Sequence, residues 1–125
     1  FETLRAVHRS KTGALIKASV LAGALGAGAD QHQLQALDSY GRQIGLAFQI
    51  VDDLLNATAT TDQLGKAAGS DAQRGKATYP AFFGIDETRN KAREAVQAAL
   101  TALNSFDQKA EPLRGLARYI ETRSH

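Results

Sequence analysis

The chain of 125 residues contains no cysteine and no methionine. Without cysteine the fold has no disulfide framework and no thiolate chemistry, which fits a reducing compartment and leads us to expect a cytoplasmic protein. Because the sequence lacks methionine and opens Phe-Glu-Thr-Leu, it does not begin at a translation start, and we expect it to be part of a longer chain. We find no signal peptide, since a basic segment followed by an apolar one is missing from its beginning.

Long apolar runs and a strong net charge are missing as well. The longest uncharged apolar stretch, residues 18–29, is too short to span a bilayer, so we expect no membrane span. The net charge of +2 is too small to indicate nucleic-acid binding. Apolar residues make up 43% and charged residues 22%, which is the mixture of an ordinary globular domain. No segment alternates with period two over a useful length, so we predict an all-α fold.

Helical periodicity predicts two helices in the first half of the chain. We expect the first over about residues 3–25, ended by the glycines at 26 and 28, and the second over about residues 31–56, with Asp30 as its N-cap. The apolar stripe of the first helix comprises Ala14, Leu15, Ala18, Leu21, Ala22 and Leu25. The second helix has a continuous apolar face comprising Leu34, Leu37, Tyr40, Ile44, Phe48 and Val51.

Two further helices are predicted in the second half. Tyr79-Pro80 opens a short apolar turn, Asp86 is a plausible cap for the third helix, and Glu111-Pro112 starts the fourth. The third helix has an apolar stripe of Ala92, Val96, Ala99, Leu100 and Leu103. The fourth directs Leu113, Leu116, Ala117 and Ile120 inward.

The stretch GRQIGLAFQIVDDLLN, residues 41–56, is the centre of this pattern. Gly41 and Gly45 lie one turn apart and allow a neighbouring helix to approach closely, and we expect that neighbour to lie upstream of the present sequence. Asp52 and Asn56 share one stripe with Gln49, and Asp53 lies about 100° around the helix from Asp52. Charges beside a core need a partner, and here the partner should be a cation.

Oxygen ligands at the end of a helix suit Mg²⁺, which takes one or two carboxylates together with waters and substrate phosphates. They do not suit zinc, because histidine and cysteine are absent nearby. The segment that follows, residues 58–78, has no apolar periodicity and contains Gly65, Gly69 and Gly75 with the cations Lys66, Arg74 and Lys76. We interpret it as a candidate lid whose lysines contact phosphate oxygens. The alternative is a helix end whose acids merely face water.

Four motifs in register carry a family resemblance: KTGALI at 11–16, GLAFQIVDDLLN at 45–56, LGKAAGSD at 64–71 and GKATYPAFFG at 75–84. Together they resemble the C-terminal half of the trans-type polyprenyl diphosphate synthases, the farnesyl and geranylgeranyl diphosphate synthase family. The resemblance covers essentially the whole chain. It implies an all-α isoprenoid-synthase bundle, usually a homodimer. It also implies a reaction in which Mg²⁺ helps an allylic diphosphate ionise and isopentenyl diphosphate attacks the cation.

The resemblance also implies roles for single residues. Asp52 and Asp53 match the first two acids of the second aspartate-rich motif and would bind Mg²⁺, with Asp52 the direct ligand. Lys11 and Thr12 match the pair that holds the allylic diphosphate. Further substrate contacts are implied for Phe48, Gln49, Lys66 and Lys76, with Phe48 beside the prenyl chain and Lys76 in the lid.

The sequence departs from the family pattern in two ways. Asn56 stands where the motif has a third aspartate, which removes one negative charge from the metal site. The first aspartate-rich motif, which lies upstream in the family, has no counterpart here. We therefore expect residues 1–125 to form the C-terminal portion of a single prenyltransferase domain, inactive alone. Two alternatives remain open: a non-catalytic helical partner subunit or binding module, and a relative of the class I terpene cyclases. Because upstream helices would be missing, we expect an exposed apolar surface and a homo-oligomer.

Overall fold

The computed structural model describes residues 13–59 and 78–123, and the structural statements below concern those two segments. They contain the helices α2 (Ala14–Gly26), α3 (Gln31–Ala59), α5 (Tyr79–Ala102) and α6 (Glu111–Thr122), with one 3₁₀ turn, η3 (Gln108–Ala110). No strand occurs in them, which confirms the all-α prediction. Among the described helices, none has the length and apolarity that a membrane crossing requires.

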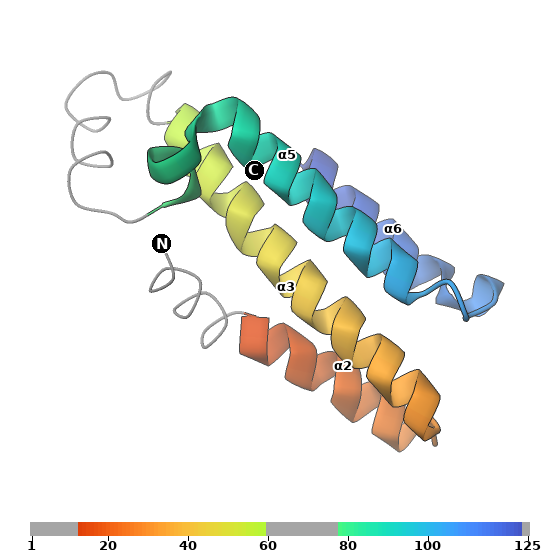
Figure 1. Cartoon of the computed structure of the whole chain (residues 1–125). Helices are drawn as coiled ribbons and strands as arrows, with labels where there is room; N and C mark the ends of the chain where they lie inside the picture. Colours follow the sequence, from red (N-terminus) through yellow and green to blue (C-terminus); the bar gives the residue numbers. More distant parts are fainter. Residues whose placement is uncertain (1–12, 60–77, 124–125) are drawn as a thin grey trace.

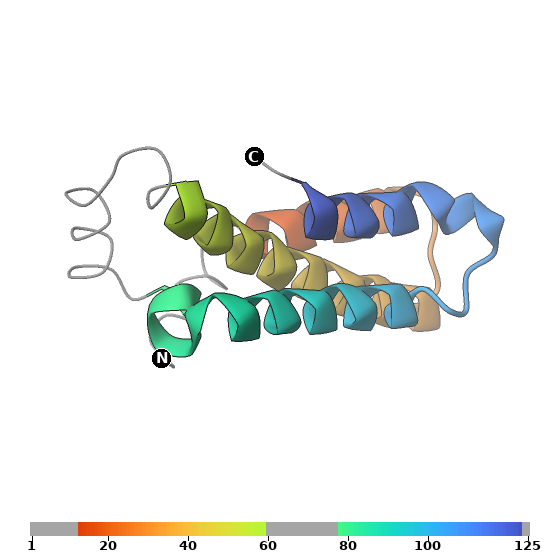
Figure 2. The same ribbon diagram turned by 90° about the horizontal axis from the view of Figure 1, so that it is seen from above.

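Helix α3 is the central element of the bundle. It packs against α2, α5 and α6, and successive helices run in opposite directions (Figure 1 and Figure 2). As a result, α3 and α6 end at the same end of the bundle at which α2 and α5 begin. We call this the motif end, because Asp52, Asp53 and Asn56 lie on the last turns of α3.

The start and the inner face of α3 agree with the sequence prediction. Asp30 Oδ1 accepts a hydrogen bond from the Gln33 N–H at 2.8 Å, and Gln33 Oε1 accepts one from the Asp30 N–H at 3.0 Å. This reciprocal pair is a capping box, in which two otherwise unpaired backbone donors are satisfied. On the predicted face, Leu37, Tyr40, Ile44 and Val51 are buried, and Leu34 and Phe48 pack against the core from its margin.

Gly41 and Gly45 allow a close helix contact, as predicted, but the expected neighbour was wrong. A Cβ atom on Gly45 would lie 2.8 Å from the Cα of Gly13, and one on Gly41 would lie 3.0 Å from the Cα of Lys17. The distance at Gly45 is shorter than real Cβ atoms show, and the distance at Gly41 is tighter than nearly all of their contacts. The two glycines are therefore covered by α2 and the residue before it, within this chain, and not by a helix upstream of it.

The predicted buried stripe of α2 was wrong in its phase. Leu15 and Leu25 are 69% and 64% exposed, Ala14, Ala18 and Ala22 are also exposed, and only Leu21 of the predicted set is half-buried. The helix instead faces α3 with Ile16, Val20, Leu21 and Ala24. Helix α2 is apolar around nearly its whole circumference, so hydrophobic periodicity does not define its inner face. The glycine contacts of α3 select the face that is buried.

Two details in the second half also differ from the prediction. Helix α5 begins at Tyr79, with the Thr78 side chain accepting from the Ala81 N–H at 3.3 Å, so Asp86 is not its first cap. The expected turn survives as a break at Gly84, whose φ of 81° and ψ of 171° interrupt the helix. The stripe from Ala92 to Leu103 is inward as predicted. On α6, Ala117 and Ile120 are buried, but Leu116 is 46% exposed.

A buried hydrogen bond joins α3 to α6. The Tyr40 hydroxyl donates to the carbonyl oxygen of Leu113 at 2.8 Å, and the tyrosine side chain is fully buried. Burial disfavours the ionised phenolate and raises the pKa of Tyr40 to about 12. The bond fixes the first turns of α6, and thereby the direction in which this helix runs toward the motif end.

Candidate functional site

The two adjacent aspartates at the end of α3 occupy different environments. The Asp52 side chain is 48% exposed, while Oδ2 of Asp53 accepts a hydrogen bond from the Tyr79 N–H at 3.2 Å. Tyr79 is the first residue of α5, where backbone N–H groups have no partner inside the helix. A carboxylate at this position also interacts favourably with the positive end of the helix dipole. Asp53 therefore joins the end of α3 to the start of α5, and Asp52 faces outward.

Asp52 has a cationic partner that sequence reasoning missed. Arg123 follows the last turn of α6, and its Nη2 lies 3.6 Å from Oδ1 of Asp52. The same Nη2 donates to the carbonyl oxygen of Phe48 at 3.3 Å. The guanidinium carbon lies 4.4 Å from the centroid of the Phe48 ring, a cation–π geometry. With only 10% of its side chain exposed, Arg123 is held on three sides at the motif end.

The general expectation of a cation beside the acids is thus met by a residue outside the predicted set. The available signal was weak, because an arginine after an amphipathic helix is ordinarily a solvated end. Because α3 and α6 run in the same direction (Figure 2), their C-terminal ends lie together, and this places Arg123 on the Phe48–Asp52 turn. Lys11, Thr12, Lys66 and Lys76, for which the sequence predicts contacts with diphosphate, lie outside the described residues together with the predicted lid.

Phe48 and Gln49 have distinct surroundings. Phe48 is partly buried, with its ring beneath the Arg123 guanidinium, and Gln49 is also partly exposed. The predicted prenyl-chain contact of Phe48 therefore involves a ring that already carries a cation on one face. Asn56 lies one helical turn beyond Asp52 and is exposed.

The donor set fits a magnesium site that is completed by other ligands. Asp52, Asp53 and Asn56 offer only oxygen donors of the kind Mg²⁺ prefers. Within residues 13–59 and 78–123, no group of three or more acidic, histidine or cysteine side chains is placed to hold a metal alone. This matches the usual behaviour of Mg²⁺, which keeps waters and binds through one or two carboxylates together with substrate phosphates. The residues fit a shared metal–diphosphate site and do not form a closed protein cage.

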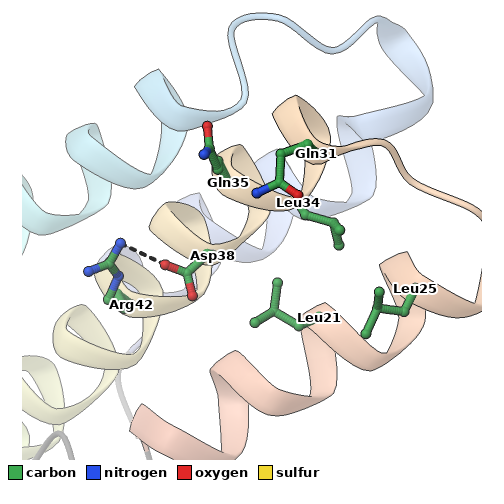
Figure 3. A pocket seen from close by; sticks show the side chains of 7 residues that line it. All are labelled: Leu21, Leu25, Gln31, Leu34, Gln35, Asp38 and Arg42. Atoms are coloured by element: carbon green, nitrogen blue, oxygen red, sulfur yellow. Dashed lines mark ion pairs between the residues drawn. The ribbon is translucent and has the colours of Figure 1, made fainter.

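A depression lies between α2 and α3, away from Asp52 and Asp53. Figure 3 shows Leu21 and Leu25 of α2 opposite Leu34 of α3, with the Asp38–Arg42 ion pair at one side. Asp38 binds Arg42 at 2.6 Å and Lys17 of α2 at 3.2 Å, so this carboxylate joins the two helices. The volume of the depression is about 360 Å³. We assign the depression a structural origin, because its one carboxylate is already engaged by two cations.

Comparison with known proteins identifies the family. The family model of the polyprenyl synthetases matches residues 1–114. The chain is 49% identical over 123 residues to a dimethylallyltranstransferase of Fischerella ambigua, covering 98% of this chain and 36% of that protein. It is 44% identical to a geranylgeranyl diphosphate synthase of Cyanophora paradoxa, covering 99% of this chain and 41% of the relative.

Two further relatives extend the likeness to structure. A farnesyl diphosphate synthase of Escherichia coli is 43% identical, with 98% of this chain and 42% of the relative covered. A solved structure from Marinomonas sp. MED121, assigned as a farnesyl-diphosphate synthase, superposes with a TM-score of 0.76 at 39% identity. The match covers 94% of this chain and 39% of that one. The chain thus spans well under half the length of these relatives, and its fold is part of the isoprenoid-synthase bundle. It belongs to the polyprenyl synthetase family.

Proposed function

We propose that this chain is the part of a farnesyl- or geranylgeranyl-type diphosphate synthase that binds one Mg²⁺ and the allylic diphosphate. The observation that carries the proposal is Asp52, a half-exposed carboxylate beside a second carboxylate at the motif end of a chain of this family. Mg²⁺ held by Asp52, Asp53 and Asn56 would stabilise the negative charge on the leaving diphosphate as the allylic C–O bond breaks. Isopentenyl diphosphate would then form a C–C bond to the allylic carbon and lose a proton.

The residues divide the work of such a site. Asp52 binds the metal. Asp53 accepts a hydrogen bond from the Tyr79 N–H and offers its remaining lone pairs to the same metal. Asn56 contributes an amide oxygen without charge. Lys11 and Thr12 precede Gly13 in the sequence, and with Lys66 and Lys76 they supply the cations and hydroxyl for the diphosphate.

The proposal includes a limit on activity. The site as described has one outward carboxylate and one uncharged amide, which is too little negative charge to hold the metal ions of a complete synthase site. The family's first aspartate-rich motif has no counterpart in the sequence. We therefore propose that residues 1–125 bind substrate but do not elongate it unless the upstream half is supplied.

Isothermal titration of the chain with dimethylallyl diphosphate, with and without Mg²⁺, tests this function. We expect binding that requires Mg²⁺, is lost in Asp52→Ala, and is weakened in Lys66→Ala. Asp86→Ala is the matched control, because Asp86 is a fully exposed aspartate that is not among the predicted site residues. Binding that Asp52→Ala leaves unchanged contradicts the assigned metal site.

A second assay addresses turnover. The chain alone should not convert radiolabelled isopentenyl diphosphate into a longer prenyl diphosphate. Joined to the upstream portion of a full-length relative, it should form product, and Asp52→Ala in the joined protein should abolish it. Failure of the joined, folded protein to elongate supports the alternative of a non-catalytic partner subunit.

We also propose that the chain self-associates, and that the outward stripe of α2 is the contact surface. This stripe comprises Ala14, Leu15, Ala18, Ala22 and Leu25, all exposed. A contiguous apolar face of this kind is uncommon on a monomer and is typical of an interface.

A further inference from the structure

Arg123 stands in an unusual relation to the proposed metal ligand. Its Nη2 is 3.6 Å from Oδ1 of Asp52, which is within ion-pair distance, yet it donates its hydrogen bond to the Phe48 carbonyl oxygen. The carboxylate is thus partly neutralised without being covered, since Asp52 remains 48% exposed. A ligand oxygen in this situation is accessible to a cation but carries a reduced effective charge.

The guanidinium is also fixed in place. It is stacked on the Phe48 ring at 4.4 Å and hydrogen-bonded to the backbone of the same residue, with a side chain only 10% exposed. The Phe48 carbonyl belongs to the turn of α3 that carries Asp52, so the ring, the carbonyl and the carboxylate form one surface for the guanidinium. When a metal approaches Asp52, this cation does not withdraw into water as an exposed lysine would.

We infer that Arg123 weakens the binding of a divalent cation at Asp52, so that the metal is retained only together with a diphosphate. The two positive charges share one carboxylate at short range, and their repulsion lowers the affinity for the metal alone. A diphosphate bound to the metal supplies the negative charge that offsets Arg123. The residue acts through Asp52 and is a positioning and tuning residue, not a catalytic one. The inference rests on the proposed metal site.

The experiment measures metal affinity directly. Mn²⁺ prefers the same oxygen ligands as Mg²⁺, and electron paramagnetic resonance reports its free concentration during a titration. In Arg123→Gln we expect the affinity for Mn²⁺ alone to rise by roughly threefold to tenfold. The reason is that the Arg123 charge, on a side chain only 10% exposed, is incompletely screened by solvent from a metal at Asp52. The enhancement of Mn²⁺ binding by inorganic diphosphate should shrink by a similar factor.

Three companion variants make the result specific. Arg123→Lys retains the charge but loses the planar stack that fixes it, so its Mn²⁺ affinity should lie between that of the unaltered chain and that of Arg123→Gln. Arg123→citrulline retains shape and hydrogen-bond donors and removes only the charge, and it should reproduce Arg123→Gln even where the glutamine variant folds poorly. Semisynthesis can introduce citrulline, since the chain contains no cysteine to compete with a ligation at residue 117 that is desulfurised back to alanine. Thermal unfolding in EDTA measures the purely structural effect of each change.

The outcomes separate the inference from the function beneath it. An unchanged or lower Mn²⁺ affinity in the citrulline variant, with Asp52→Asn abolishing binding, overturns the role of Arg123 and leaves the metal site intact. Mn²⁺ binding that Asp52→Asn does not alter overturns both. Higher affinity in the neutral variants, which disappears when Asp52→Asn is combined with them, establishes the role.

Discussion

The N–H of Tyr79 and Oδ2 of Asp53 are 3.2 Å apart, although 26 positions separate the two residues in the chain. One end of this bond is the first residue of α5, and the other lies two turns before the end of α3. The bond therefore joins the last turns of α3 to the start of α5 at the motif end. It also gives two neighbouring acids different tasks, which can be separated by mutation.

Asp53→Ala should destabilise the fold more than Asp52→Ala does. Loss of the Asp53 carboxylate leaves a helix-terminal donor without this partner and removes a favourable charge from the start of α5, at a cost of about 1–2 kcal/mol. Asp52 is half-exposed and paired loosely with Arg123, so its loss should cost less than about 1 kcal/mol. Urea unfolding without metal measures both. Equal destabilisation by the two variants would contradict the division of tasks.

Alanine at Gly45 should be destabilising, and alanine at Gly23 stabilising. A Cβ atom at Gly45 meets the Gly13 backbone at 2.8 Å and must push α2 away, which typically costs about 1–3 kcal/mol. At Gly23, also inside a helix, a Cβ atom has nothing within 4 Å, so alanine gains helix propensity of about 1 kcal/mol. Thermal unfolding of the two variants measures both changes in stability. A stabilising Gly45→Ala would show that the α2–α3 contact is looser than described.

Because Tyr40 is buried, we expect the folded protein to lose stability in alkaline solution. Its pKa is about 12 in the folded protein against 10.0 when exposed, so the folded state binds the proton more tightly. This stability is present in full below pH 10 and is lost as the pH rises toward 12, by up to about 2–3 kcal/mol. Tyr40→Phe should cost about 1–2 kcal/mol near pH 7, where the Leu113 carbonyl loses its donor, and should show a shallower decline above pH 10.

Urea midpoints at pH 8, 10 and 11 provide the comparison for Tyr40. Tyr119→Phe is the control, because it makes the same substitution at a tyrosine that is 56% exposed. Parallel curves for Tyr40→Phe and the unaltered chain would show that Tyr40 does not determine the alkaline decline.

The outward stripe of α2 should govern self-association. Sedimentation should show a dimer or larger species, and Leu15→Glu combined with Leu25→Glu should convert it to a monomer with little change in fold, since both side chains are more than half exposed. Leu116→Glu on α6 is the control, because it also replaces an exposed leucine. A stable monomer before any substitution would exclude the proposed contact.

Local sequence patterns predicted most of the fold. The N-cap of α3, its inner face and the stripe of α5 follow from residue types within a few turns of each other. The buried face of α2 could not be predicted, because leucines and alanines surround that helix and only the approach of Gly41 and Gly45 selects a side. Leu116 was misassigned for a related reason: α6 is short, and a rotation by one residue, about 100°, changes which leucines face the core.

The candidate site was predicted where it lies within one helix. The positions of Asp52, Asp53 and Asn56 relative to one another follow from helix geometry alone. The partners of the two acids could not be predicted, since Tyr79 and Arg123 reach them only through the packing of α5 and α6 against α3. A sequence contains no local sign that an arginine 75 positions beyond Phe48 will stack on its ring.

The break at Gly84 has a consequence for how chains of this family can diversify. The turn from Tyr79 to Phe83 touches the acid-bearing end of α3, whereas the long segment after Gly84 carries the buried stripe that holds the bundle together. A backbone with positive φ at the junction lets the front turn be re-aimed without rotating the segment behind it. Natural variation, or an engineer exchanging the exposed Ala81 and Phe82, can reshape the surface of this front turn while the buried Tyr79 and the buried stripe after Gly84 are retained.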